Sequence, residues 1–101
     1  MLKVCVDLPT TVRSGFINGL RSLLNESEQY DFACLEDDAK LVITDTLQGN
    51  FPTNRFYVVI SQAEISGLQK NVRLVPMFNA RIFLLNRLPA IKHVVDVSSR
   101  H

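Results

Sequence analysis

The chain has 101 residues and a mass of 11.4 kDa, enough for one domain and too little for two. Hydrophobic residues make up 47% and charged residues 21%, a composition typical of a globular domain with a packed core. The formal charge of +1 does not favour a protein that holds nucleic acid with clustered Lys and Arg. No apolar run approaches the ~20 residues of a membrane span, and the N-terminal run is too short for a signal peptide. We expect a soluble, cytoplasmic domain whose partners include no nucleic acid and, in this segment, no membrane.

The two cysteines, Cys5 and Cys34, each lie inside an apolar run. Such positions are typical of small buried hydrophobes in a reducing compartment, and no His stands near either residue to favour a zinc site. We expect both thiols to be buried and unpaired, and we predict no metal and no cofactor. His93 and His101, in or near the C-terminal tail, are interpreted as solvated.

The first half of the chain predicts a strand, a helix and two more strands. The run "LKVCV" is β-branched and is closed by "DLP", which indicates a buried strand followed by a turn. A helix is expected from about Thr11 to Asn25, and "YDFACLE" and "KLVITD" predict the second and third strands. The apolar stripe of the helix comprises Val12, Phe16, Leu20, Leu23 and Leu24.

The link between the second and third strands is short. Only Asp37, Asp38 and Ala39 separate the two runs, whereas a parallel crossover through a helix takes about a dozen residues. We expect a non-helical connection, and the direction of the second strand stays open.

The second half predicts two strands and a closing helix. "RFYVVIS" and "VRLVPM" are strands, separated by "QAEISGLQKN", in which Gly67 limits any helix to a turn or two. Asn79 is a good N-cap for a helix from Ala80, and Pro89 predicts a kink or stop near Leu88 because it costs ~3 kcal/mol inside a helix. The residues of this helix expected to be buried are Ile82, Phe83, Leu85, Leu88 and Ile91.

Together these elements predict one small α/β sandwich. About five strands form its sheet, with a strong helix after the first strand, a helix after the last, and the central crossover helices reduced to loops. The domain is expected to span residues 1–96, with residues 97–101 as a flexible tail.

Polar residues stand where three of the predicted strands end: Asp7, Asp45 and Ser61. In open α/β sheets the carboxyl ends of the strands form the ligand-binding edge. A phosphoacceptor site there needs an acceptor Asp, further acids for Mg²⁺, a hydroxyl and a Lys. Val6 halves the usual acidic pair before Asp7, and Met77 stands where the Lys is wanted. The predicted site is therefore incomplete.

Structural roles compete with catalysis at these positions. Asp45 would accept hydrogen bonds from the backbone of the loop "TLQGN", and Asp7 would cap the turn and helix that follow it. Lys70 and Arg73 lie too early in the chain to supply the missing cation. We predict a protein that is not an enzyme. Asp45, Asp7 and Ser61 form the catalytic set only if the chain is a phosphoacceptor.

Two segments resemble a known family. "KVCVDLPTTVRSGFINGLRSLL" is similar to the opening of a response-regulator receiver, and "LVITD" is similar to its phosphoacceptor strand, which places Asp45 at the acceptor position. Because the central helices of a receiver are missing, the chain more closely resembles the shortened α/β/loop (ABL) domain of Rcs-type phosphorelay sensor proteins, over residues 2 to about 92. The resemblance implies a receiver-like, flavodoxin-like fold and a docking module that recognises a response regulator.

Three hypotheses about function follow. The first is a non-enzymatic docking module that binds a response regulator; the second is a divergent phosphoacceptor that uses Asp45 with Mg²⁺. The third is a pseudo-receiver that forms a weak homodimer through its last strand and helix. The residues expected to bind a partner are Arg13, Arg21, Leu47 and Phe51, although Phe51 could instead fold back over the sheet in place of a lost helix.

Overall fold

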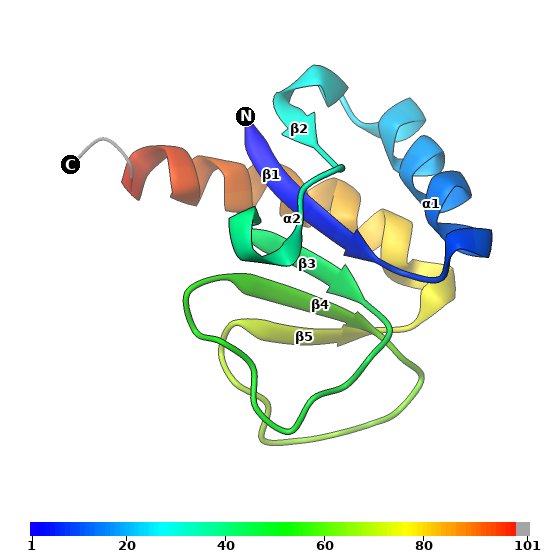
Figure 1. Ribbon diagram of the computed structural model, residues 1–101, viewed down its shortest axis with the longest axis vertical. Helices are drawn as coiled ribbons and strands as arrows, with labels where there is room; N and C mark the ends of the chain where they lie inside the picture. The colour runs from blue at the N-terminus through cyan, green and yellow to red at the C-terminus, as the bar shows by residue number, and fades with distance from the viewer. Residues whose placement is uncertain (99–101) are drawn as a thin grey trace.

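A computed structural model describes residues 1–98. Within this range five strands form a single parallel sheet in the order β2-β1-β3-β4-β5 (Figure 1). This order is that of flavodoxin-like doubly wound sheets, and it confirms the predicted α/β class. The strands are β1 (Leu2–Asp7), β2 (Tyr30–Asp31), β3 (Leu41–Thr44), β4 (Phe56–Ile60) and β5 (Val72–Val75).

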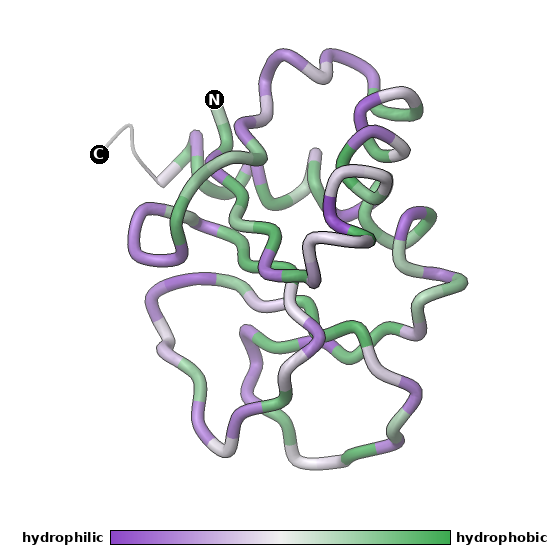
Figure 2. Tube along the Cα trace, turned by 45° about the vertical axis from the view of Figure 1, so that its right-hand side comes forward, coloured by the Kyte–Doolittle hydropathy of each residue, from purple (hydrophilic) through white to green (hydrophobic). Residues whose placement is uncertain are grey.

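Two α-helices in the described part of the chain, α1 (Thr10–Leu23) and α2 (Met77–Ser98), cover the same face of the sheet (Figure 1). We call this the helix face; its strand residues include Val4, Leu41 and Val58. The central strands are apolar on both faces, as parallel strands buried on both sides must be (Figure 2). The helix face therefore holds the larger core, in which these strand residues pack against Phe16, Leu20, Leu84 and Leu88.

The opposite face, which we call the loop face, is covered by chain without α-helix. Its strand residues are Cys5, Val42, Tyr57, Val59 and Val72. Residues 45–55 and 61–71 connect β3 to β4 and β4 to β5, and they lie where a doubly wound sheet would carry helices. The structure thus confirms that the central crossover helices are reduced to loops.

Phe51 fills the position of a lost helix. It is 3% exposed, and its ring centroid lies 4.7 Å from that of Tyr57. The Gln69 carboxamide fixes it there by accepting a hydrogen bond from Phe51 N–H (2.7 Å) and donating one to Phe51 C=O (2.8 Å). Asn71 Nδ2 donates to the carbonyls of Pro52 and Arg55, at 2.7 Å each. Of the two readings of Phe51, the structure shows the one in which it covers the sheet.

Strand β2 is much shorter than "YDFACLE" predicted, because Asp31 bends the chain. Its carboxylate accepts hydrogen bonds from Ala33 N–H (2.9 Å) and Cys34 Sγ (3.2 Å), an Asx turn that ends the strand. These hydrogen bonds lower the Asp31 pKa, and the bond from the Ala33 backbone has the larger effect. Only Leu2 pairs with Tyr30 and Lys3 with Asp31, and the pairing is parallel.

The chain crosses β1 between β2 and β3 without an α-helix, as expected. Residues 32–40 contain one 3₁₀ turn, Glu36–Asp38, and touch β1 through an antiparallel bridge between Ala33 and Cys5. Lys40 N–H then donates to Lys3 C=O at 2.9 Å, which starts β3 beside β1. The crossover is parallel although it is shorter than a helical one, because it lies flat on the strand that it crosses.

Helix α1 turns a slightly different face to the sheet from the one predicted. Phe16, Ile17 and Leu20 are buried within it, as is Leu24 just after it. Val12 is 42% and Leu23 57% exposed, so their predicted burial is wrong. Val12 and Leu23 lie on the same side of the helix, and the sheet contacts the neighbouring side, which carries Phe16 and Leu20.

Helix α2 begins earlier and ends later than predicted. It starts at Met77 because Asn79 N–H donates to Pro76 C=O (3.0 Å), so Asn79 lies in its first turn and is not its N-cap. It runs through Pro89, and Leu88 is no stop. Burial of Ile91, which lies beyond the proline and contributes ~1.5–3 kcal/mol, offsets much of the ~3 kcal/mol cost of the proline.

The helix continues to Ser98, so residues 97 and 98 of the predicted tail are helical, and residues 99–101, with His101, lie outside the described residues. His93 is exposed, as expected. Ile82 is 63% exposed, against prediction, while Ala80 and Leu84 are buried in its place. No helix in residues 1–98 is long and apolar enough to cross a membrane.

Both cysteines are free thiols, as predicted. Cys5 is buried, and that burial, followed by the charge of Asp7, raises its thiol pKa. Cys34 is only half-buried because it follows the Asp31 turn and belongs to no strand. Burial and the Asp31 carboxylate raise its pKa as well.

We expect Phe51→Ala to lower the free energy of unfolding by about 3–5 kcal/mol, because it removes a buried ring and leaves a cavity. Urea denaturation followed by circular dichroism measures the change. Leu47→Ala, in the same loop at a side chain 40% exposed, is the matched control and should cost below about 1 kcal/mol. Equal losses in the two variants would contradict the structural role given to Phe51.

Candidate functional site at the carboxyl edge

The carboxyl ends of the strands bring together two of the three residues that the sequence singled out. The β1–β3 register pairs Asp7 with Thr44, so Asp45 follows directly beside the end of β1. In flavodoxin-like sheets this is the point where the strand order reverses and where ligands bind. Asp7 and Asp45 therefore lie at the edge where the sequence predicted a site, and the contacts of their side chains decide what chemistry is possible there.

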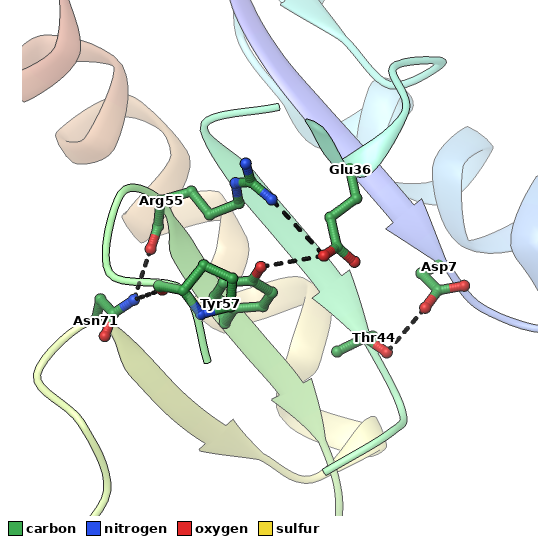
Figure 3. Close-up of polar contacts among 7 residues, drawn as sticks. Asp7, Glu36, Thr44, Arg55, Tyr57 and Asn71 are labelled. Atoms are coloured by element: carbon green, nitrogen blue, oxygen red, sulfur yellow. Dashed lines mark hydrogen bonds and ion pairs between the residues drawn. The ribbon is translucent and has the colours of Figure 1, made fainter. Parts of the chain in front are cut away.

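The Asp7 carboxylate is hydrogen-bonded to the Thr44 hydroxyl. Thr44 is 2% exposed and donates its hydroxyl hydrogen to Asp7 Oδ2 at 3.3 Å (Figure 3). The same hydroxyl oxygen accepts a hydrogen bond from Thr46 N–H at 3.1 Å, so Thr44 joins the strand end to the loop. Asp7 therefore contacts β3 and does not cap α1, whose N-cap, Pro9, carries no side-chain cap.

Asp45 is exposed at the start of the 45–55 loop. Its Oδ1 accepts a hydrogen bond from Thr46 Oγ1 at 3.4 Å. The loop-fixing role predicted for the Asp45 carboxylate, acceptance from backbone N–H groups, is performed by the Thr44 hydroxyl. Sequence analysis missed Thr44 because a β-branched residue in "KLVITD" reads as one more strand position.

Ser61 follows β4 and is engaged with its own surroundings. Its hydroxyl oxygen accepts from Ala63 N–H at 3.1 Å, and its own N–H donates to Val75 C=O at 3.0 Å. These bonds hold the start of the 61–71 loop against β5. Within residues 1–98, no hydrogen bond joins Ser61 to Asp7 or Asp45.

The cations near the sheet lie mostly away from this edge. Lys70 precedes β5 and Arg73 is its second residue, so both lie before its carboxyl end; Met77, just beyond that end, is 46% exposed. Arg13 is the exception: its Nε donates to Val6 C=O at 3.0 Å, next to Asp7. That bond holds the half-buried Arg13 at the end of β1.

The other residues expected to bind a partner are divided among surface and core. Arg21 is exposed on α1, with its guanidinium carbon 5.6 Å from the Phe32 ring centroid. Leu47 is 40% exposed, whereas Phe51 is in the core. Arg21 and Leu47 are therefore accessible on the surface, and Phe51 is not accessible in this conformation.

A second polar cluster, which sequence analysis did not find, lies toward the amino ends of the strands (Figure 3). Arg55 Nη1 is 3.6 Å from Glu36 Oε2, and Tyr57 Oη donates to the same oxygen at 3.3 Å. The Arg55 side chain is 9% exposed, and its buried Nε has no hydrogen-bond partner in residues 1–98. Burial is the main cause of the raised Tyr57 pKa. The cluster ties the 3₁₀ turn of the crossover to β4.

No group of three or more His, Cys, Asp and Glu side chains that could hold a metal ion occurs in residues 1–98. Comparisons with known protein families, with curated proteins and with solved structures found no match for this chain. The receiver resemblance therefore stays a prediction.

We expect no response to phosphoryl analogues, because Thr44 holds the Asp7 carboxylate and no Lys lies at the end of β5. Addition of beryllofluoride and Mg²⁺ should leave the amide resonances of the ¹⁵N-labelled protein unchanged. Asp45→Ala is the control. Saturable shifts around Asp45 that disappear in this variant would instead support the phosphoacceptor hypothesis.

Proposed function

We propose that this domain is a non-enzymatic, cytoplasmic docking module of two-component signalling that binds the receiver of a response regulator. The observation that carries the proposal is the Thr44–Asp7 hydrogen bond at the carboxyl edge of a sheet with flavodoxin-like strand order. The edge that would hold Mg²⁺ in a receiver is here tied together by the protein's own side chains. What is left for the domain is recognition by its surface.

The surface of α1 fits such a partner. Residues 10–23 contain Arg13 and Arg21 and no acid. A receiver, as the resemblance implies, exposes several acids at its phosphoacceptor edge, so its charge would complement that of α1. Val12 and Leu23 are also exposed, on the flank of α1 opposite Arg21, and they would add apolar contacts of the kind that accompany Arg in interfaces.

Binding of purified receiver domains from the same genome tests the proposal, with isothermal titration calorimetry as the measurement. We expect at least one receiver to bind, and Arg21→Glu to weaken it by about tenfold or more because the reversed charge repels the acidic edge. Lys3→Glu is the matched control, since Lys3 is also exposed but lies on β1. Failure of every receiver to bind, at concentrations up to about 1 mM, would refute the proposal.

A homodimer is the second candidate, because Phe78 and Ile82 are 77% and 63% exposed one turn apart at the start of α2. An isologous contact could bury this pair against its copy. Sedimentation equilibrium should then show a dimer that Ile82→Glu converts to a monomer. Leu23→Glu, at a similarly exposed leucine on α1, should leave the dimer intact. A wild-type monomer at millimolar concentration would exclude this candidate.

A further inference from the structure

A groove runs along the helix face between the C-terminal half of α2 and the amino halves of β4 and β5. Its deepest part has a volume of about 160 Å³. A shallower hollow of about 450 Å³ continues it and shares Phe56, Asn71 and Val94 with it. Phe56 is 36% and Val94 51% exposed, so the apolar floor is open to solvent. The deep part is smaller than the about 300 Å³ of the smallest typical small-molecule pockets, and its size suits one inserted side chain.

Basic residues surround this apolar floor. Lys70, Arg73 and Arg87 line the deep part, and Lys40 lines the continuation. None of the lining residues in the described part of the chain is acidic. Arg55 also borders the groove, but its guanidinium is turned to Glu36. The groove therefore combines an apolar centre with a positive rim.

The nearly neutral net charge conceals this local excess. Residues 10–23 and 77–98, which form the two helices, carry five Lys or Arg and a single acid, Asp96. Asp96 is in turn bonded to Lys92 at 2.8 Å. The other nine acids lie in the strands and connecting loops. The helix layer is thus positive, and the groove lies along its border with the sheet.

The exposed edge of the sheet is poorly suited to an added strand. β5 is the last strand and only four residues long, Pro76 follows it, and Arg73 projects from it on the helix face. Short edges, prolines and inward-pointing charges are devices that prevent strand addition. A partner on this side would have to lie in the groove and not extend the sheet.

We propose that this groove binds an acidic peptide segment that inserts one apolar or aromatic side chain. The anchor would lie between Phe56 and Phe83, and flanking carboxylates would meet Lys70, Arg73 and Arg87. The proposal rests on the docking function and deepens it by naming a binding surface apart from α1 and the chemistry of its partner.

The cation over Phe83 and the small number of cations at the rim favour an acidic peptide over single-stranded nucleic acid. The Arg87 guanidinium carbon is 5.6 Å from the Phe83 ring centroid, so this ring already has a cation over it and is no free platform for a base. Four cations rim the groove, fewer than the about 6–10 phosphate contacts of typical nucleic-acid binding. A short peptide with a few carboxylates can be neutralised by these four cations.

Selection of a random 12-residue peptide library on the full chain tests the proposal. We expect the enriched peptides to be rich in Asp and Glu around one Phe, Leu or Trp. The binding of a synthetic enriched peptide, measured by fluorescence anisotropy, should fall at least tenfold in the double variant Lys70→Glu, Arg73→Glu. Lys3→Glu, Arg21→Glu makes the same change of charge at two exposed residues outside the groove and should leave the affinity within twofold.

Further measurements keep the test decisive if the double charge reversal destabilises the fold. Phe56→Ala, at an exposed side chain, should also weaken the peptide at least tenfold, and the wild-type amide shifts should centre on β4, β5 and the end of α2. Enriched peptides without acidic residues, or affinity unchanged in the Lys70 and Phe56 variants, would overturn the proposal. Displacement of the peptide by oligo-dT at equal concentration would assign the groove to nucleic acid instead.

The outcome is separable from that of the docking function. Receivers that bind through Arg21 while no acidic peptide binds the groove would remove this inference and leave the proposed function intact. Loss of receiver binding in the Lys70 and Arg73 variant, with the Arg21 variant unaffected, would place the response-regulator contact in the groove.

Discussion

The pairing of the Gln69 carboxamide with the backbone of Phe51 is the interaction on which the loop face depends. Two connections without helices, residues 45–55 and 61–71, meet at these two hydrogen bonds. Each contributes ~0.5–1.5 kcal/mol net, and leaving a buried backbone group unpaired costs ~1–3 kcal/mol. The bonds also hold the Phe51 ring over Tyr57. An ordered pair of loops can therefore bury the apolar strand residues that helices cover in other doubly wound sheets.

This solution divides the molecule into two unlike sides. Nine of the ten acids lie outside α1 and α2, and the loop side is closed by hydrogen bonds from the Gln69 and Asn71 side chains to backbone carbonyls. The helix side carries most of the exposed apolar residues of the molecule and an excess of positive charge. These residues lie on sides of α1 and α2 that do not contact the sheet. Helix α2 is apolar nearly all round, although only one stripe of it meets the sheet. Apolar residues on every side of a surface helix are a common sign of contact with another molecule.

At the carboxyl edge, a single hydroxyl group, that of Thr44, gives Asp7 at the end of β1 a structural role. Asp7 and Asp45 stand where a phosphoacceptor would need them, yet Thr44 bridges Asp7 and the loop backbone. An acid engaged by a buried hydroxyl contributes to the position of the loop, and the 45–55 loop in turn carries Phe51 to the sheet. Polar residues at this edge and apolar residues on the loop face therefore belong to the same structural unit.

The sequence by itself determined the class of fold, the five strands and the two helices, because these follow from periodic apolar runs and from the scarcity of residues between them. It also determined that the central crossovers contain no helices. Only the tertiary structure decided which side of each helix is buried, since both helices carry apolar residues on more than one side, as Val12 and Ile82 show. It likewise decided the short β2, the path of α2 through Pro89 and the roles of Thr44 and Gln69. Those features depend on hydrogen bonds and burial between residues distant in sequence or on turns that compete with strands, and no local pattern records them.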